Sequence, residues 1–309
     1  MNKTKIVAKK VGIIIIIACL VVVIGNYTVD NVFYNPNRDF TVASSTFSIL
    51  NQLLAPSITE SYLEQGIQGG FEFPRFSYHS QNIRLLKFSY SQPPDESENS
   101  GEINYKFGKA TLKDYSDNLG LGDLTCQQSV FLSSSETKDD YWQSISDRQS
   151  YEVWIKFQNP IDRATFTEKY HWLLDNSISR PKESGIIWIP VKTSDKLEDI
   201  CIGLAGNLSF HYLANNVFAE ENFYNMDLYG RELVLREALK FLIDHQKETD
   251  IFINTGLWVH AETVDFEERY EYLHQNEIQY LGFVALINGS DLRTLKNEAV
   301  NIVQLKEDK

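Results

Sequence analysis

The sequence predicts an α+β protein with one N-terminal apolar helix, a β-rich first region and a C-terminal α/β sandwich. Three observations lead to this prediction. Residues 11–24 form one uninterrupted apolar run, VGIIIIIACLVVVI. Residues 151–157, YEVWIKF, alternate as a strand with one buried face does. Two stretches, YEVWIKFQNPIDRATF and GFVALINGSDLRTL, each lead from an apolar strand through an Asn-containing turn into a helix.

The apolar run exceeds the length of an ordinary strand and therefore predicts a helix. Counted to Tyr27, it has about seventeen residues, the short end of what a membrane-crossing helix needs. Lys9 and Lys10 can extend to one membrane interface, and Tyr27 suits the other. We therefore expect a transmembrane helix over residues 11–27. Its anchor residues are Val11, Ile14, Ile17, Leu20 and Ile24.

The flanking charges predict the orientation of this helix. Four lysines and no acidic residue precede it, which places residues 1–10 in the cytoplasm and the bulk of the chain outside. A cleaved signal peptide is one alternative, although the small-residue cleavage pattern is poor. A second alternative is a lipoprotein site, because Ile16-Ile17-Ala18-Cys19 has the hydrophobic–small–cysteine order that would leave Cys19 lipidated. Against it, the chain stays apolar through Ile24. Both alternatives leave the bulk of the chain outside the membrane.

Composition limits the function of the external part. The net charge is −13, and without the four lysines of the tail 25 basic residues face 42 acidic ones. Nucleic-acid binding is therefore excluded, because phosphate contacts need a basic face. Of the three cysteines, Cys126 and Cys201 are external. They form either one disulfide or two separately buried thiols.

The first external domain, residues 28–132, is predicted to be β-rich. Residues 83–90 and 103–107 alternate as strands do, and residues 92–101, QPPDESENSG, have the composition of a loop. Helical signals are fewer in this domain, and the strongest of them predicts a helix at residues 59–65. The polar, acidic residues 133–150 are interpreted as a linker.

The C-terminal domain, residues 151–309, has clearer signals. Thr165–Glu168 has the pattern of a capping box, followed by a buried stripe of Phe166, Tyr170 and Leu173. A second helix is expected at residues 231–245, with Glu232 and Arg236 on its outer face, and Asp265 is expected to cap a third. Further strands are predicted at residues 185–191, 280–287 and 300–305, and a helix at 290–298. The two strand–helix–strand units predict helices on one face of a roughly four-stranded sheet, as in ferredoxin-like folds.

No catalytic or metal-binding motif in the sequence is convincing, so we predict no enzyme, no metal site and no cofactor. Glu271-x-x-His274, with Glu267 one turn earlier, has the spacing of a metal site but is interpreted as a solvated helix face. His260-Ala-Glu262 lacks the cysteine pair of a zinc deaminase. Trp154 and Trp188 are interpreted as core aromatics. The insert at 193–230 supplies the candidate partner contacts, Phe218, Phe223, Tyr224 and Tyr229.

Several segments of the C-terminal domain together resemble a known family. They are YEVWIKF, IIWIPV, CIGLAG, ALKFLIDHQKE and ERYEYLHQNEIQYLGFVALINGSDLRTL, followed by a short final strand. This combination resembles the extracytoplasmic C-terminal domain of sigma factor regulators, the anti-sigma factors of Gram-positive bacteria that restrain extracytoplasmic-function sigma factors. The resemblance covers residues 151–304.

Two features depart from that family. Its members place a sigma-binding segment before the membrane helix, whereas residues 1–10 are too short to form one. Cys201 stands where the relatives tend to have proline before Ile202-Gly203. The resemblance therefore implies an accessory role, in which the chain pairs in the cell membrane with a separate anti-sigma subunit. A different hypothesis is a membrane-anchored or lipidated module that binds a small molecule or cell-wall fragment.

Overall fold

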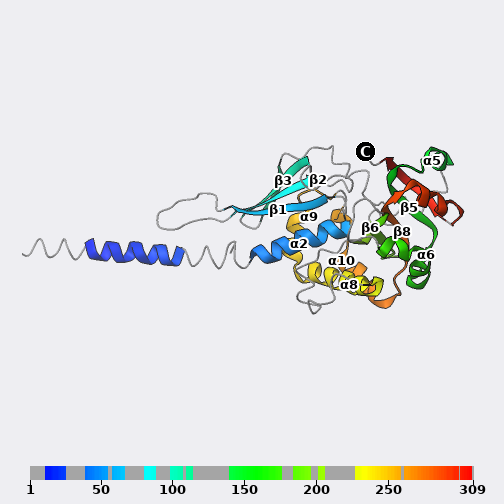
Figure 1. The fold of residues 1–309 in the computed structure, drawn as a ribbon. Helices are drawn as coiled ribbons and strands as arrows, with labels where there is room; N and C mark the ends of the chain where they lie inside the picture. The colour runs from blue at the N-terminus through cyan, green and yellow to red at the C-terminus, as the bar shows by residue number, and fades with distance from the viewer. Residues whose placement is uncertain are drawn as a thin grey trace, which may run out of the picture.

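The computed structural model contains two β-sheets with helices packed against them, so the protein is α+β as predicted (Figure 1). Each sheet is built from strands of one half of the chain. The residues that the structure describes are 11–25, 39–54, 58–66, 80–87, 98–106, 109–113, 139–175, 184–195, 201–205, 227–258, 261–298 and 300–307.

The larger sheet has five strands in the order β7-β6-β8-β5-β9, and each neighbouring pair is antiparallel. Four of the strands were predicted. The fifth, β7, pairs with β6 at one edge, which corrects the expected four-stranded sheet. The strands are β5 (Ser150–Ile161), β6 (Gly185–Val191), β7 (Ile202–Ala205), β8 (Tyr280–Asn288) and β9 (Val300–Glu307).

The sheet contains the two strand–helix–strand units that the sequence predicted, and the structure shows that their strands interleave. The first unit joins β5 to β6 through α6 (Arg163–Asp175), and β8 lies between its strands. The second joins β8 to β9 through α11 (Gly289–Thr294) and the 3-10 turn η5 (Leu295–Asn297), and β5 lies between its strands. The strands of each unit therefore run parallel to each other, as in a split β-α-β arrangement.

One face of the sheet packs against α6. Phe166, Tyr170 and Leu173 of α6 are buried, which confirms the predicted stripe. The rings of Tyr170 and Phe157 stack with their centroids 5.3 Å apart, and Phe166 meets Phe157 edge-on at 6.0 Å. The predicted inward residues of β5 belong to this core; they are Tyr151, Val153, Ile155 and Phe157.

The opposite face of the sheet carries a second, smaller apolar cluster that includes Trp154 and Trp188. The two tryptophans are 4% and 1% exposed, which confirms that they are core aromatics. A Cβ on Gly203 would lie 2.2 Å from the Trp188 ring, so only glycine leaves room for this indole. Cys201, in the same cluster, is disulfide-bonded, whereas Cys19 is free. Of the two arrangements left open by the sequence, two separately buried thiols are therefore ruled out for Cys201, and Cys126 lies outside the described residues.

The smaller sheet has four antiparallel strands in chain order, β1 (Ile58–Gly66), β2 (Ser80–Lys87), β3 (Glu98–Lys106) and β4 (Lys109–Lys113). The helix expected at residues 59–65 is wrong, because these residues form β1. Pairing with β2 outweighs a weak local helical signal. The predicted end of the loop at residues 92–101 is also wrong, because β3 already begins at Glu98.

A helix that the sequence did not predict connects the two sheets. Helix α2 (Asp39–Leu54) contacts β1 of the smaller sheet and β7 of the larger one (Figure 1). Its Phe47 is fully buried against Phe252 and Trp258, with ring centroids 5.7 and 5.5 Å apart. Helix α2 also packs against α8 (Leu228–Asp244) and α9 (Gln246–Ile253), and α10 (Phe266–Gln275) packs against α8.

The predicted linker is partly structured. Its residues 139–144 form helix α5 (Asp139–Ser144), and Trp142 and Ile145 are buried in the main core. The Tyr151 hydroxyl accepts a hydrogen bond from the Ser146 backbone N–H at 2.7 Å. The described part of this segment therefore packs onto the C-terminal domain.

Residues 11–25 are helical, as the length of the apolar run predicted. Their large side chains, except Val22, are exposed, from 49% at Val11 to 65% at Ile14. Within the described part of the chain, no helix has both the length and the apolar character required to cross a membrane.

Candidate functional site

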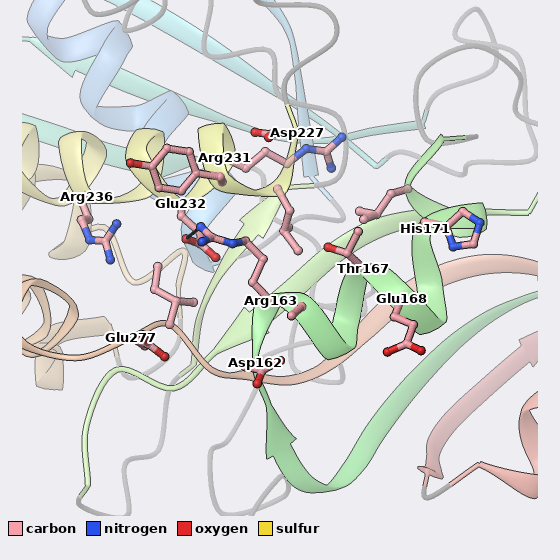
Figure 2. A pocket seen from close by; sticks show the side chains of 15 residues that line it. Asp162, Arg163, Thr167, Glu168, His171, Asp227, Arg231, Glu232, Arg236 and Glu277 are labelled. Carbon is pink, nitrogen blue, oxygen red and sulfur yellow. Dashed lines mark hydrogen bonds and ion pairs between the residues drawn. The ribbon is translucent and has the colours of Figure 1, made fainter.

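A cavity of about 1120 Å³ lies between α6, which lines it from Asp162 to Leu174, and the first turns of α8 (Figure 2). The segment that precedes β8, including Glu277 and Ile278, forms a further part of its wall. The cavity is lined mainly by charged side chains and has a few apolar ones, such as Leu174 and Leu228.

The start of α6 is positioned by Asp162, which follows an irregular stretch at the end of β5. Its Oδ1 accepts a hydrogen bond of 2.7 Å from the Thr165 backbone N–H, so Asp162 caps the helix. The capping box predicted at Thr165 is therefore placed three residues too late. The hydrogen bond from Thr165 lowers the pKa of the Asp162 carboxyl.

Helix α8 begins in a similar way. Asp227 is its N-cap, and its Oδ1 accepts a hydrogen bond of 2.8 Å from the Gly230 backbone N–H. The first turns of α8 then present Tyr229, Arg231 and Glu232 to the cavity. More than half of the residues that line the cavity therefore lie at or near these two capped helix starts.

A buried carboxylate connects the two helices to the sheet. Glu232 of α8 is 4% exposed, and its Oε2 accepts a hydrogen bond of 2.9 Å from Arg163 Nη1 of α6. The Tyr280 hydroxyl of β8 donates to Oε1 of the same carboxylate. Burial, and then the hydrogen bond with Glu232, raises the pKa of Tyr280. The predicted outward position of Glu232 is therefore wrong, because this inter-element network holds it inside.

The guanidinium of Arg163 has a second partner. It lies 4.7 Å above the centroid of the Tyr229 ring, a cation–π arrangement. Tyr229 is 49% exposed. It is the one predicted partner-contact residue among those described, because Phe218, Phe223 and Tyr224 lie outside them.

Two further arginines line the cavity. Arg231 is 5% exposed; burial lowers its pKa, and the nearby Asp227 carboxylate opposes that effect. Arg236 is half-buried and donates from Nε to the Leu273 carbonyl oxygen at 3.0 Å. In Figure 2, Arg236 and Glu277 lie on the same side of the cavity.

The lining residues combine both signs of charge. Three guanidinium groups are accompanied by the carboxylates of Asp162, Glu168, Asp227, Glu232 and Glu277. Charged hydrogen-bonding groups around a concave volume are suited to binding a polar molecule in a fixed orientation.

The motifs weighed in the sequence do not contribute to this cavity. His274 stacks on Tyr270 at a ring distance of 5.7 Å, and Glu271 accepts a hydrogen bond from Gln275. Within the described ranges, no group of three or more potential metal ligands comes together. His260 lies outside those ranges.

Sequence reasoning missed the cavity because its residues come from three separate segments. One signal was available: Asp162-Arg163 and Asp227 through Glu232 each combine a capping aspartate with a nearby arginine at a helix start. That signal identifies helix starts but does not indicate that the two starts meet.

Comparisons with protein families, with curated proteins and with solved structures found no match.

Proposed function

We propose that this protein is a membrane-anchored regulator of an extracytoplasmic-function sigma factor, acting as an accessory to a separate anti-sigma subunit. The proposal begins with the resemblance to sigma factor regulators. The segments that carry it form β5, β6, β7, the end of α8 with α9, and α10 through α11, all within the C-terminal domain. Its fold would be the ferredoxin-like type expected from the duplicated units.

The observation that carries the membrane part of the proposal is the exposure of helix 11–25. Its exposed residues include Ile13 through Ile17, five consecutive positions that together cover every side of a helix. A protein groove would cover only one side, whereas lipid covers all of them. Fifteen helical residues span about 22 Å at 1.5 Å per residue. The preceding lysines and Tyr27 would lie at the two interfaces.

A single helix transmits a signal only if its association or tilt differs between two states. In this proposal the external domains bias the association of helix 11–25 with the helix of an anti-sigma subunit. The helix is then both an anchor and a contact surface.

The test is co-purification of the tagged full chain from native membranes after crosslinking. We expect an anti-sigma subunit, with or without its sigma factor, to be recovered. A matched control replaces residues 11–25 by an unrelated apolar helix, which should keep the chain in the membrane but lose the partner. Recovery of neither subunit with the native helix would contradict the proposal.

A second candidate function is supported by the cavity between α6 and α8, whose lining combines charged groups of both signs with apolar surface, as a ligand site does. In this alternative the chain is an external binding module for a small molecule or cell-wall fragment. Mass spectrometry of the N-terminus separates the two: a diacylglyceryl group on Cys19 favours the binding module, and an intact residue 1–10 tail favours the regulator.

A further inference from the structure

We propose that the cavity between α6 and α8 binds a short peptide-like molecule that carries both a carboxylate and a free amine. This inference rests on the second candidate function and names the chemical class of its ligand. It also fits the first function, in which such a molecule would be the signal that the external domain receives.

Internal contacts account for part of the charge in the cavity. The Glu232 carboxylate is engaged by Arg163 at 2.9 Å and by the Tyr280 hydroxyl. The Asp227 carboxylate favours the charged form of the Arg231 guanidinium and so opposes the lowering of its pKa by burial. These pairs form much of the permanent wall of the site.

Arg236 is suited to bind the carboxylate of the ligand. Its hydrogen bond to the Leu273 carbonyl uses Nε alone, and this bond fixes the direction of the side chain. The two terminal nitrogens make no hydrogen bond to the described residues, and the side chain lines the cavity. A guanidinium held in this way can donate two parallel hydrogen bonds to one carboxylate.

Exposed carboxylates provide the complementary position for an amine. Asp162, Glu168 and Glu277 line the cavity and are exposed. Glu277 lies on the same side as Arg236 (Figure 2). A ligand with an ammonium group near Glu277 and a carboxylate at Arg236 would satisfy both charges.

The balance of charge favours such an amphoteric ligand over a simple anion. Five carboxylates accompany three guanidinium groups, so a phosphate or nucleotide would meet more negative than positive charge. The cavity volume of about 1120 Å³ is slightly above the usual range of small-molecule pockets, which leaves room for several residues of peptide. The half-exposed Tyr229 ring adds an apolar surface for an aliphatic side chain.

The experiment is titration calorimetry of the purified full-length chain in detergent with the tripeptide Ala-Glu-Lys. Two modified probes test each charge separately: one is acetylated at both its α-amine and its lysine ε-amine, and the other is amidated at both its carboxylates. A disaccharide of N-acetylglucosamine tests a sugar ligand. We expect the unmodified tripeptide to bind and each modified probe to bind at least about tenfold more weakly.

Variants assign the two charges to residues. Arg236→Gln should weaken binding of the unmodified tripeptide by about tenfold or more. Lys240→Gln, on the exposed side of the same helix, should leave its binding unchanged. Glu277→Gln should weaken binding of the tripeptide with free amines but should not weaken binding of the acetylated one. Glu267→Gln, at another exposed position, is its control. Circular dichroism checks that each variant is folded.

Absence of tripeptide binding, equal binding by Arg236→Gln, or binding of the sugar alone would overturn the inference. The regulator proposal is tested separately by co-purification. A chain that recovers its membrane partner but fails to bind the tripeptide would refute the ligand assignment and leave the regulator proposal standing.

Discussion

The two sheets of this protein differ in how their strands are buried, and this difference explains which parts of the fold the sequence revealed. In the larger sheet, β6 is buried along its whole length and β8 along all but its last residue. In the smaller sheet, β4 alternates between exposed and half-buried positions. Two-sided burial demands long apolar runs that are visible in the sequence, whereas short polar strands leave a weak pattern.

The comparison also shows that the two sheets share one core. Phe47 and Leu50 of α2 and Ile103 of β3 belong to the same apolar cluster as the inward residues of β5. Within the described residues, the strands of the smaller sheet therefore have no separate hydrophobic core. The first of three predictions tests this shared core, and the other two test the contacts that hold α8 and α6 within the half of the molecule that the sequence revealed better.

The largest effect is expected from Phe47→Ala. The side chain is fully buried between Phe252 and Trp258, so its removal should cost about 3–5 kcal/mol of unfolding free energy. Urea unfolding of the full chain in detergent measures this. Phe47→Leu, which keeps most of the volume, should cost less than about 1.5 kcal/mol. A loss from Phe47→Ala below about 1 kcal/mol would mean that α2 does not belong to the shared core.

An intermediate effect is expected from Tyr280→Phe, which removes the link between β8 and the Glu232 carboxylate. Loss of a buried hydrogen bond to a charged group should cost about 1.5–3 kcal/mol at neutral pH. The folded pKa of Tyr280 is raised above the unfolded value of about 10, so this stability is present below pH 10 and is lost as the pH rises further.

The pH dependence provides the control for this variant. Because the wild type loses this contribution above about pH 10, the stability difference between it and Tyr280→Phe should shrink there. Tyr170, whose pKa burial raises to about 12, is present in both proteins and cancels in the comparison. A difference that stays constant from pH 8 to pH 11 would contradict the assigned network.

The smallest effect is expected from Asp162→Asn at the start of α6. Asparagine can still accept the hydrogen bond from the Thr165 N–H, so the neutral-pH stability should change only slightly. The folded pKa of Asp162 is lowered, so its contribution is present above about pH 4 and is lost as the pH falls further. The wild type should therefore lose more stability than the variant between pH 5 and pH 2. Parallel thermal melting curves across that range would refute this cap.

The elements of the C-terminal domain could be predicted because each carried a local signal. Asp265 caps α10 with a hydrogen bond of 2.9 Å to the Glu268 N–H, as its position before an apolar stripe predicted. Leu235, Leu239 and Leu242 of α8 are buried, as the helical spacing required. These features depend on neighbours within a few residues, so a single sequence contains them.

The smaller sheet and α2 could not be predicted in the same way. The sequence of β1, ITESYLEQG, has no strong strand signal, and it forms a strand because β2 pairs with it. Helix α2, DFTVASSTFSILNQLL, mixes β-branched and polar residues that favour helix only weakly. Its burial in a core made largely by residues from 151 onward stabilises it, and that partner is remote in the chain.

The candidate site depended still more on tertiary structure. Glu232 was predicted to face outward because its neighbours in sequence suggest a charged helix surface. Its actual partners, Arg163 and Tyr280, lie 69 and 48 residues away along the chain. Only the packing of α8 against α6 and β8 brings the three groups together, so no local pattern could indicate that this carboxylate is buried.

By itself, the sequence determined the apolar helix at residues 11–25, the two strand–helix–strand units and the two core tryptophans. Each follows from the period and length of an apolar pattern, which local geometry converts directly into an element and its buried face. Only the tertiary structure decided that the two sheets share a core through α2 and that arginines and carboxylates of α6 and α8 enclose a cavity. Those arrangements depend on contacts between segments that are distant in the chain, where packing energy outweighs local preference.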